Sequence, residues 1–481
     1  MAQSAKERFL KEYSASLLDD IGTVFVGAGV SMAAGYPSWT ALLREIGDEL
    51  GVKSTDVYDL AALAQWSVHS AGGYSRIRQV IRDNIAKELA LPETVRIIAR
   101  LPLRYIWTTN YDRLLERAFS EINRPLDAIS AAGDLSLKPQ PGAVRLYKMH
   151  GSIDRLDDLV ISTDDYELFR SKRGAYLPLL QAHLTGMSML FVGLSFADPN
   201  IKHVLSLIRE SFTDAPPEHF AIVRPPQRKD FKSKSEFSAR ATQHALWAKD
   251  LRRYGLVAVE IDNYDEVPVL LKLVERRVAQ RRVWISGSWP LHEGVTDASK
   301  VYEIAAGIGR HVGETGLSLV TGNGLLVGSA AIAGFLDSLR RDGGWDLDRR
   351  LIARPFPQPI AGQPPDLEQW TQLRKELARL AGIVVFIGGE KMLQDKTGIA
   401  DGVMQEFSLA KASGAFLLPI GATGGAARKI AAKLMGSSLP CKGSGMVRPT
   451  DAELQRLCDV SFDAKKLVSV ACGVLKRAQK G

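Results

Sequence analysis

Short apolar runs separated by longer amphipathic stretches recur along this 481-residue chain. In the N-terminal half the runs are continuous, which is typical of strands buried on both faces of a parallel sheet. The stretches between them have the apolar spacing of helices that cover such a sheet. The strands predicted in this half are residues 23–26, 105–109, 144–149, 189–192, 220–223 and 256–261, with mostly helical structure between 39 and 103.

The same alternation begins again after a helix predicted over residues 267–280, which ends among the arginines Arg276, Arg277, Arg281 and Arg282. We therefore expect two domains, residues 1–278 and 279–481. The strands predicted in the second are residues 283–286, 317–320, 382–387 and 415–420. The fold class expected is α/β, with two doubly wound parallel-sheet domains of the Rossmann-like type.

Composition narrows the class of protein further. Hydrophobic residues make up 46% and charged residues 24% of the chain, as in an ordinary globular protein. The net charge of +8 comes from Lys and Arg interspersed with acids, so we expect polyphosphate ligands rather than nucleic acid. Residues 1–20 predict an amphipathic helix, and no apolar run is long enough for a bilayer, which favours a cytoplasmic protein without a membrane partner. The cysteines Cys441, Cys458 and Cys472 form no C-x-x-C pair, so no metal is expected.

The first candidate for chemistry follows the first predicted strand. There the chain turns through the small residues Gly27, Ala28, Gly29 and Ser31. Glycines let a backbone approach a phosphate, and the amides at a helix start favour negative charge. This pattern predicts a dinucleotide pocket. Met32 stands where the dehydrogenase spacing G-x-G-x-x-G needs its third glycine, so hydride transfer is not expected.

Three further polar segments lie at the ends of predicted strands, where open α/β sheets bind ligands. They contain Asn110 and Asp112, His150 before Gly151, and Gly193 and Ser195. Taken singly, an Asn-x-Asp is usually a helix cap and a His-Gly a turn. All three segments and the first motif follow predicted strands, and this shared placement, together with their order along the chain, favours a single site.

Together the four motifs resemble the SIR2 family over about residues 15–265. Gly27-Ala28-Gly29-Val30-Ser31, with Gly35 and Pro37, is similar to its phosphate loop, Asn110 and Asp112 to its Asn-x-Asp motif, His150 to its catalytic His-Gly, and Gly193 with Ser195 to its adenosine-side motif. The resemblance implies NAD as substrate, Asn110 and His150 as catalytic residues, and a dinucleotide-binding set of Gly27, Ala28, Gly29, Ser31, Asp112, Gly193 and Ser195. Ser38-Trp39 replaces the family's Asp-Phe-Arg, and its four-cysteine zinc module is missing. Both departures argue against protein deacylation.

Hydrolysis of NAD to nicotinamide and ADP-ribose is the reaction that these residues suit. Nicotinamide leaves its ribose as a neutral base and needs no general acid, so the site must orient the sugar, stabilise positive charge and deliver water. Asn110 could hold a ribose hydroxyl or the attacking water. His150 could accept a proton, because an imidazole has an ordinary pKa of about 6.5. Asp112 could bind the carboxamide, support the cation or simply cap a helix.

The second half has its own small-residue turns after strands, and several such turns together favour a phosphate- or ribose-binding site. This half resembles the SLOG superfamily, relatives of the phosphoribohydrolases. Glu390-Lys391 and an insertion through Asp401 replace the tight turn of those enzymes, which favours sensing over base hydrolysis. Arg374 and Lys391 would neutralise phosphates, and Glu406 would accept hydrogen bonds from ribose hydroxyls. Taken singly, each of these charges is more simply interpreted as a solvated residue on the surface of a helix. The implied signal-binding residues are Gly287, Ser288, Gly322, Gly324, Arg374, Gly388, Gly389, Lys391 and Glu406.

A SIR2 domain before a SLOG domain resembles the NADase effectors of the Thoeris anti-phage defence system. The resemblance implies that a TIR-domain protein makes a cyclic ADP-ribose isomer, that this signal binds the SLOG domain, and that the SIR2 domain then depletes NAD. It also implies a homo-oligomer, a tetramer or higher. The alternatives are a SIR2 protein deacylase, a non-enzymatic nucleotide sensor, a C-terminal phosphoribohydrolase, and an NADase switched on by a cyclic oligonucleotide.

Overall fold

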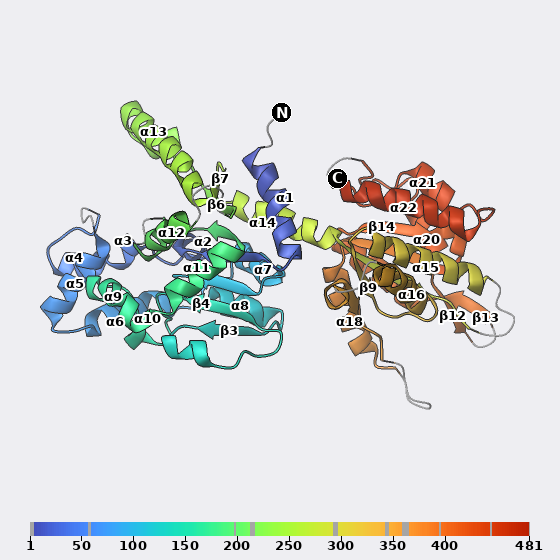
Figure 1. The fold of residues 1–481 in the computed structure, drawn as a ribbon, viewed down its shortest axis with the longest axis horizontal. Coiled ribbons are helices and arrows are strands. Elements are labelled where there is room, and N and C mark those ends of the chain that lie inside the picture. The colour runs from blue at the N-terminus through green and yellow to red at the C-terminus, as the bar shows by residue number, and fades with distance from the viewer. Residues whose placement is uncertain are drawn as a thin grey trace. The chain divides into compact units, whose positions relative to one another are not determined.

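The computed structural model describes residues 4–55, 59–196, 199–211, 217–291, 297–341, 346–357, 365–393, 396–442 and 445–480. The chain divides into two compact units, Met1–Glu275 and Arg276–Gly481. The division falls inside helix α14 (Glu266–Gln280), the helix in which the sequence analysis sets its boundary. Each unit is built around a parallel sheet (Figure 1), so the predicted α/β class with two doubly wound domains is confirmed.

The N-terminal unit has a seven-stranded sheet of order β3-β4-β2-β1-β5-β6-β7, in which every neighbouring pair is parallel. All five residues of its central strand β1 are buried. This explains why the central strands read as continuous apolar runs. The strands are β1 (Gly22–Val26), β2 (Tyr105–Thr108), β3 (Leu126–Ile129), β4 (Val144–Lys148), β5 (Ser188–Val192), β6 (His219–Val223) and β7 (Leu256–Glu260).

The helices of this unit are α1 (Ala5–Leu18), α2 (Ala28–Ala33), α3 (Trp39–Leu42), α4 (Arg44–Glu49), α5 (Leu60–Ala71), α6 (Ser75–Ile85), α7 (Glu93–Arg100), α8 (Leu114–Glu121), α9 (Thr163–Glu167), α10 (Phe169–Arg173), α11 (Tyr176–Gly186), α12 (Pro199–Ser211), α13 (Lys234–Asp250) and the start of α14, with short 3₁₀ turns at Ala132–Ser136, Leu156–Asp158, Arg228–Asp230 and Leu251–Tyr254. They cover both faces of the sheet. Phe25 and Phe191 pack with α10, α11 and α12 on one face. Phe220, on the other face, contacts Phe9 of α1. Helix α13 projects away from the sheet (Figure 1), and none of its residues is buried.

The strand order places a switch point beside β1. The chain passes from β1 to β2 on one side and later reaches β5 on the other side of β1. The loops that leave the carboxyl ends of β1 and β5 therefore run to opposite directions along the sheet. In open α/β sheets this divergence forms the crevice where ligands bind. Gly27 follows β1 and Gly193 follows β5, so both stand at this crevice.

The C-terminal unit has a five-stranded parallel sheet of order β10-β9-β8-β11-β14, with its switch point between β8 and β11. A separate antiparallel pair, β12 and β13, forms the insertion that the sequence shows before Asp401. The strands are β8 (Arg282–Ser288), β9 (Ser318–Thr321), β10 (Leu351–Ala353), β11 (Ile383–Gly388), β12 (Glu390–Leu393), β13 (Lys396–Ile399) and β14 (Phe416–Ile420).

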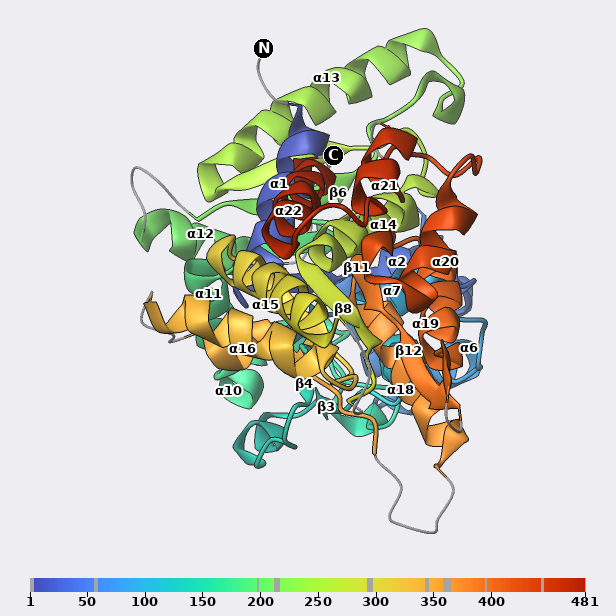
Figure 2. The same cartoon turned by 90° about the vertical axis from the view of Figure 1, so that its right-hand side faces the viewer.

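Helices cover both faces of this second sheet as well. The helices are α15 (Ala298–Glu314), α16 (Val327–Arg341), α17 (Leu347–Arg350), α18 (Leu367–Leu380), α19 (Asp401–Ala412), α20 (Gly425–Leu434), α21 (Asp451–Leu457) and α22 (Ala464–Lys480), with a 3₁₀ turn at Gly421–Thr423. Val283 and Ile285 of β8 pack with α15, α16 and α22, whereas Trp284 packs with α18, α19 and α20. Figure 2 shows α15 and α16 on one side of β8 and α18, α19 and α20 on the other. No helix in the described part of either unit has the length and apolarity to cross a membrane.

Candidate functional site

The crevice beside β1 is closed at its base by two main-chain loops in direct contact. The amide of Gly27 donates to Val192 O at 2.8 Å, and that of Gly29 donates to Gly193 O at 2.8 Å. Gly193 has φ +66°, and a Cβ added to it would lie 2.7 Å from the amide nitrogen of Val30. These glycines therefore allow the loops after β1 and β5 to pack closely against each other.

Asn110 stands next to this contact, at the start of the loop between β2 and α8. Thr108, the last residue of β2, donates from its hydroxyl to Val26 O at 2.8 Å and accepts from the Asn110 amide at 3.0 Å. These bonds tie the loop to the end of β1. The Asn110 side chain donates from Nδ2 to Gly27 O at 3.0 Å and to Ser31 Oγ at 2.8 Å.

The orientation of the Asn110 amide is fixed by this arrangement. A carbonyl oxygen such as Gly27 O can only accept, so the atom facing it must be the amide nitrogen. Both hydrogens of Nδ2 are then used. Among the described residues Asn110 Oδ1 is buried and has no hydrogen-bond partner. The site therefore presents one free acceptor, as binding a ribose hydroxyl or a water requires.

Asp112 completes a relay that begins at Asn110. Ser31 accepts from Asn110 and donates from its own hydroxyl to Asp112 Oδ2 at 2.5 Å. The second carboxylate oxygen, Oδ1, accepts from the amide of Leu114 at 3.0 Å, where α8 begins. Asp112 thus binds the first amide of α8 and also orients Ser31, whereas the N-cap position of that helix belongs to Arg113.

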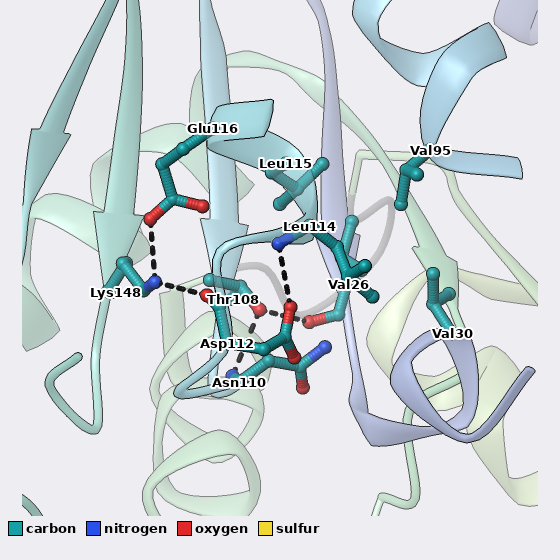
Figure 3. A pocket seen from close by; sticks show the side chains of 10 residues that line it. All are labelled: Val26, Val30, Val95, Thr108, Asn110, Asp112, Leu114, Leu115, Glu116 and Lys148. Atoms are coloured by element: carbon teal, nitrogen blue, oxygen red, sulfur yellow. Dashed lines mark hydrogen bonds and ion pairs between the residues drawn. The ribbon is translucent and has the colours of Figure 1, made fainter. Parts of the chain in front are cut away.

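A small cavity of about 10 Å³ lies against these side chains. Figure 3 shows Asn110 and Asp112 below Thr108 and Leu114, with Lys148 and Glu116 to the left and Val26, Val30 and Val95 to the right. A space of this size holds about one water molecule. It offers a position for a nucleophilic water beside Asn110, but a nicotinamide ribose needs this part of the crevice to widen.

His150 lies one strand away from Asn110, two residues beyond the end of β4. It is buried, and its ring meets the rings of Tyr166 and Phe169 edge-on, with centroids 5.5 and 6.5 Å apart. Gly151 has φ +89°, a conformation that favours glycine and turns the chain away after the histidine. Thr108 at the end of β2 pairs with Lys148 at the end of β4, and Asn110 and His150 each follow two residues later. Both residues therefore lie at the carboxyl edge of the sheet. His150 does not line the small cavity.

The remaining dinucleotide-binding candidates are distributed along the same edge. Gly27, Ala28, Gly29 and Ser31 form the β1 loop and helix α2, and Gly193 contacts that loop directly. Ser195 follows two residues later and is exposed. Across the described stretches, no group of three or more His, Cys, Asp or Glu side chains is placed to hold a metal ion.

The second candidate site, in the C-terminal unit, centres on a buried ion pair. Arg374 of α18 and Glu406 of α19 are only 7% and 5% exposed, which rules out the surface-charge interpretation for both. Glu406 accepts from Ser286 Oγ at 2.6 Å and from Arg374 Nε at 3.3 Å. Burial raises the pKa of the Glu406 carboxyl, although Ser286 and Arg374 oppose this. The guanidinium also lies over the rings of Phe356 and Trp370.

The predicted glycine turns of this unit meet at its switch point. The amide of Gly389 donates to Ser288 O at 2.9 Å, and a Cβ on Gly287 or Gly324 would overlap neighbouring main chain. Gly322 faces Phe356. Gly388 donates from its amide to Thr423 Oγ1 at 2.7 Å, and Ser288 Oγ donates to Glu390 O at 2.9 Å. Gly287, Ser288, Gly388 and Gly389 are therefore neighbours in space.

Lys391 differs from the other members of this second set. It lies on the β12–β13 hairpin, is 40% exposed, and its amino group pairs with Asp401 at 2.6 Å. The hairpin places this charge outside the buried Arg374–Glu406 pair. It thus keeps a positive charge at an accessible position beside the glycine turns.

Several residues that hold these sites were given no role by the sequence. Thr108 and Lys148 in the first unit, and Ser286 and Thr423 in the second, each bond a candidate residue or its loop. A signal existed for three of them, because Thr108, Lys148 and Ser286 occupy or adjoin the last positions of predicted strands. Thr423 carries a different signal, because it lies in the small-residue turn of residues 421–425 that follows a predicted strand.

Comparison with known proteins agrees with this geometry. Residues 104–247 match the SIR2-like domain, and residues 266–478 match the Sir2- and TIR-associating SLOG family. The NAD(+) hydrolase ThsA of Bacillus cereus (strain MSX-D12) is 32% identical over 419 residues, 87% of each chain. That of Cytobacillus dafuensis is 33% identical over 427 residues, 87% of this chain and 86% of the relative. Defense-associated sirtuin 2 of Bacillus subtilis is 26% identical over 216 residues, 43% of this chain and 21% of the relative.

The chain is thus a two-domain α/β protein with a SIR2-like domain followed by a SLOG domain. It belongs to the family of ThsA NAD(+) hydrolases, since the match extends over most of both chains.

Proposed function

We propose that this protein hydrolyses NAD⁺ to nicotinamide and ADP-ribose in its N-terminal unit, as part of a defence against phage. The observation that carries the proposal is the fixed Asn110 amide, whose Oδ1 is buried without a partner among the described residues. Asn110 is also one of the residues that line a water-sized cavity. The relatives named NAD(+) hydrolase support the same reaction, and the Bacillus subtilis relative, a defense-associated sirtuin, supports a defence role.

The chemistry follows from the charges and donors at the crevice. Asn110 Oδ1 accepts a hydrogen bond from a ribose hydroxyl or from the attacking water, and the relay through Ser31 keeps it in that orientation. Loss of nicotinamide leaves positive charge on the ribose, which the Asp112 carboxylate favours electrostatically. His150 accepts the proton of the water or of a ribose hydroxyl. In this scheme NAD is the substrate and no metal takes part.

The test is NAD hydrolysis by the purified full-length protein, with the products identified by mass. Asn110→Ala and His150→Ala should each lower kcat on the order of 100-fold or more. Asn263→Ala, at an exposed position, is the control and should retain the wild-type rate. Wild-type rates in both site variants would remove these residues from the mechanism. Transfer of an acyl group from an acylated peptide, with NAD consumed in step, would instead support the deacylase alternative.

The same proposal assigns the C-terminal unit to control of the reaction. A cyclic ADP-ribose isomer made by a TIR-domain protein would bind at the glycine turns, with its phosphates near Lys391 and Arg374. The description of the matching family as Sir2- and TIR-associating supports such a partner. A ligand activates only by binding the active arrangement more tightly than the resting one. Assembly into a homo-oligomer, a tetramer or larger, would supply the two arrangements.

A panel of cyclic ADP-ribose isomers and cyclic oligonucleotides, each added to one NAD hydrolysis assay, tests this control. A cyclic ADP-ribose isomer should raise the rate, and Lys391→Glu should abolish that rise because it reverses an accessible charge. Lys375→Glu, an exposed charge reversal on α18, is the matched control and should respond normally. Activation by a cyclic oligonucleotide alone would identify a different signal, and an unchanged response of Lys391→Glu would exclude that side chain.

A further inference from the structure

Lys148 is a lysine that the protein buries almost completely. It is the last residue of β4, a position from which a long charged side chain ordinarily reaches water, yet it is only 1% exposed. A buried ammonium is strongly unfavourable unless all three of its protons and its charge are matched. The groups that accept hydrogen bonds from this ammonium therefore show which parts of the chain it fixes.

Three acceptors surround the Lys148 amino group. It donates to the main-chain oxygen of Asp112 at 2.6 Å, to that of Tyr111 at 3.4 Å, and to Glu116 Oε1 at 2.7 Å. Figure 3 shows the ammonium between Glu116 of α8 and the loop that carries Asn110 and Asp112. Two of the three bonds thus hold the main chain of that loop. Hydrogen bonds from a charged donor are stronger than neutral ones, so the loop is firmly anchored.

The same lysine is also connected to the histidine side of the site. His150 follows it by two residues, and the amide of Ile153 donates to Tyr111 O at 2.9 Å, an oxygen that Lys148 also approaches. The strand that leads to His150 therefore carries the cation that anchors the Asn110 loop. This arrangement links the two candidate catalytic loops through one side chain.

We propose that Lys148 is a positioning residue for NAD hydrolysis, which sets Asn110 and Asp112 in place relative to His150. The inference rests on the proposed function but uses contacts that the proposed mechanism does not. Lys148 itself transfers no proton, since its three protons are directed at two carbonyls and a carboxylate. Glu116 is its counterion and balances the charge.

Lys148→Met removes the ammonium and keeps a side chain of similar length. Because a displacement of about 1 Å can cost a reaction roughly 100-fold, we expect kcat to fall by 10- to 100-fold, with KM within about threefold of wild type. The shape of the pH–kcat profile should not change, because Lys148 is not an acid or base of the reaction. Lys148→Arg should restore part of the rate, since it keeps the charge.

Loss of the cation leaves Glu116 without its partner, so the single variant could unfold for that reason alone. The double variant Lys148→Met/Glu116→Gln removes both charges and keeps Glu116's shape, and it should fold while retaining the kcat defect. Arg124→Met is the matched control. Arg124 is likewise a cation that anchors main chain, but it donates to the oxygens of Ala99, Leu101 and Leu103, which come before β2 rather than after it. We expect that control to lose stability and keep kcat.

Hydrogen exchange of the full-length protein separates this inference from the proposed function. In the double variant, peptides covering residues 109–113 and 149–153 should exchange faster, whereas those of β5 and β6 should not. A wild type that hydrolyses no NAD, either alone or with any nucleotide of the panel, would refute the proposed function, and the exchange data would still decide whether Lys148 anchors the loops. A double variant with wild-type kcat, or with unchanged exchange in both segments, would overturn the positioning role.

Discussion

At the scale of single residues, Gly193 illustrates how little space the crevice leaves. Its φ of +66° disfavours any side chain, and an added Cβ would press on Val30 N at 2.7 Å. Gly193→Ala should therefore lose about 1 kcal/mol from backbone strain and roughly 1–3 kcal/mol more from displacement of the β1 loop. NAD hydrolysis should fall with it, because the displaced loop carries Ser31.

Gly72 offers a matched comparison for that substitution. It caps α5 with φ +67°, and an added Cβ would meet nothing within 4 Å. Gly72→Ala thus reports the strain alone, and urea unfolding of the two variants measures the difference between them. Equal losses in both would show that the contact between the β1 and β5 loops contributes nothing.

Much of the site could be predicted at this scale because motifs at the ends of parallel strands meet at one edge. Ser31, Asn110 and Asp112 were expected to be neighbours on this ground, and they are bonded to one another. The place of Lys148 at the end of a predicted strand marked it as a neighbour of the site, but its burial and its bonds to the Asn110 loop could not be predicted. A lysine at a strand end is ordinarily solvated, and its counterion Glu116 lies on a helix that the sequence does not place beside it.

At the scale of elements, the difference between prediction and structure lies at sheet edges. The central strands β1, β4 and β5 were predicted, because burial on both faces requires continuous apolar runs. Two of the four edge strands, β3 and β10, were not predicted: they contain partly exposed residues, and β10 has three residues. The other two, β7 and β14, were predicted from their apolar runs. The β12–β13 hairpin was expected only as an insertion, since Glu390, Lys391 and Lys396 interrupt any apolar pattern.

The Arg374–Glu406 pair joins α18 to α19, and Ser286 joins α19 to β8. Glu406→Gln keeps the shape but leaves the Arg374 guanidinium buried beside a neutral group, and breaking a buried pair in this way costs about 3–5 kcal/mol. We expect faster hydrogen exchange in α18 and α19. Asp401→Asn breaks the exposed pair with Lys391, a change worth less than about 1 kcal/mol, and should leave both helices protected. Similar exchange in the two variants would mean that the buried pair does not hold the helices together.

At the scale of the whole N-terminal unit, two histidines predict how stability depends on pH: His219, which is buried, and His183, which is partly buried. His183 Nδ1 accepts from Trp107 Nε1 at 3.0 Å, and His219 Nδ1 accepts from the Met189 amide at 3.2 Å. Protonation at Nδ1 would break these bonds and charge a ring that is at least partly buried. Burial lowers the pKa of each from 6.5 to about 4.

The unfolded chain therefore takes up these protons below about pH 6.5, and the folded unit only below about pH 4. The contribution of both histidines to stability is complete above pH 6.5 and is lost progressively as pH falls towards 4. Thermal unfolding between pH 7.5 and 4.5 should show a midpoint that decreases with acidification. His219→Asn keeps an acceptor for the Met189 amide and cannot be protonated, so its midpoint should fall less steeply than that of the wild type. Parallel curves would show that His219 does not titrate in this range and that other groups cause the loss.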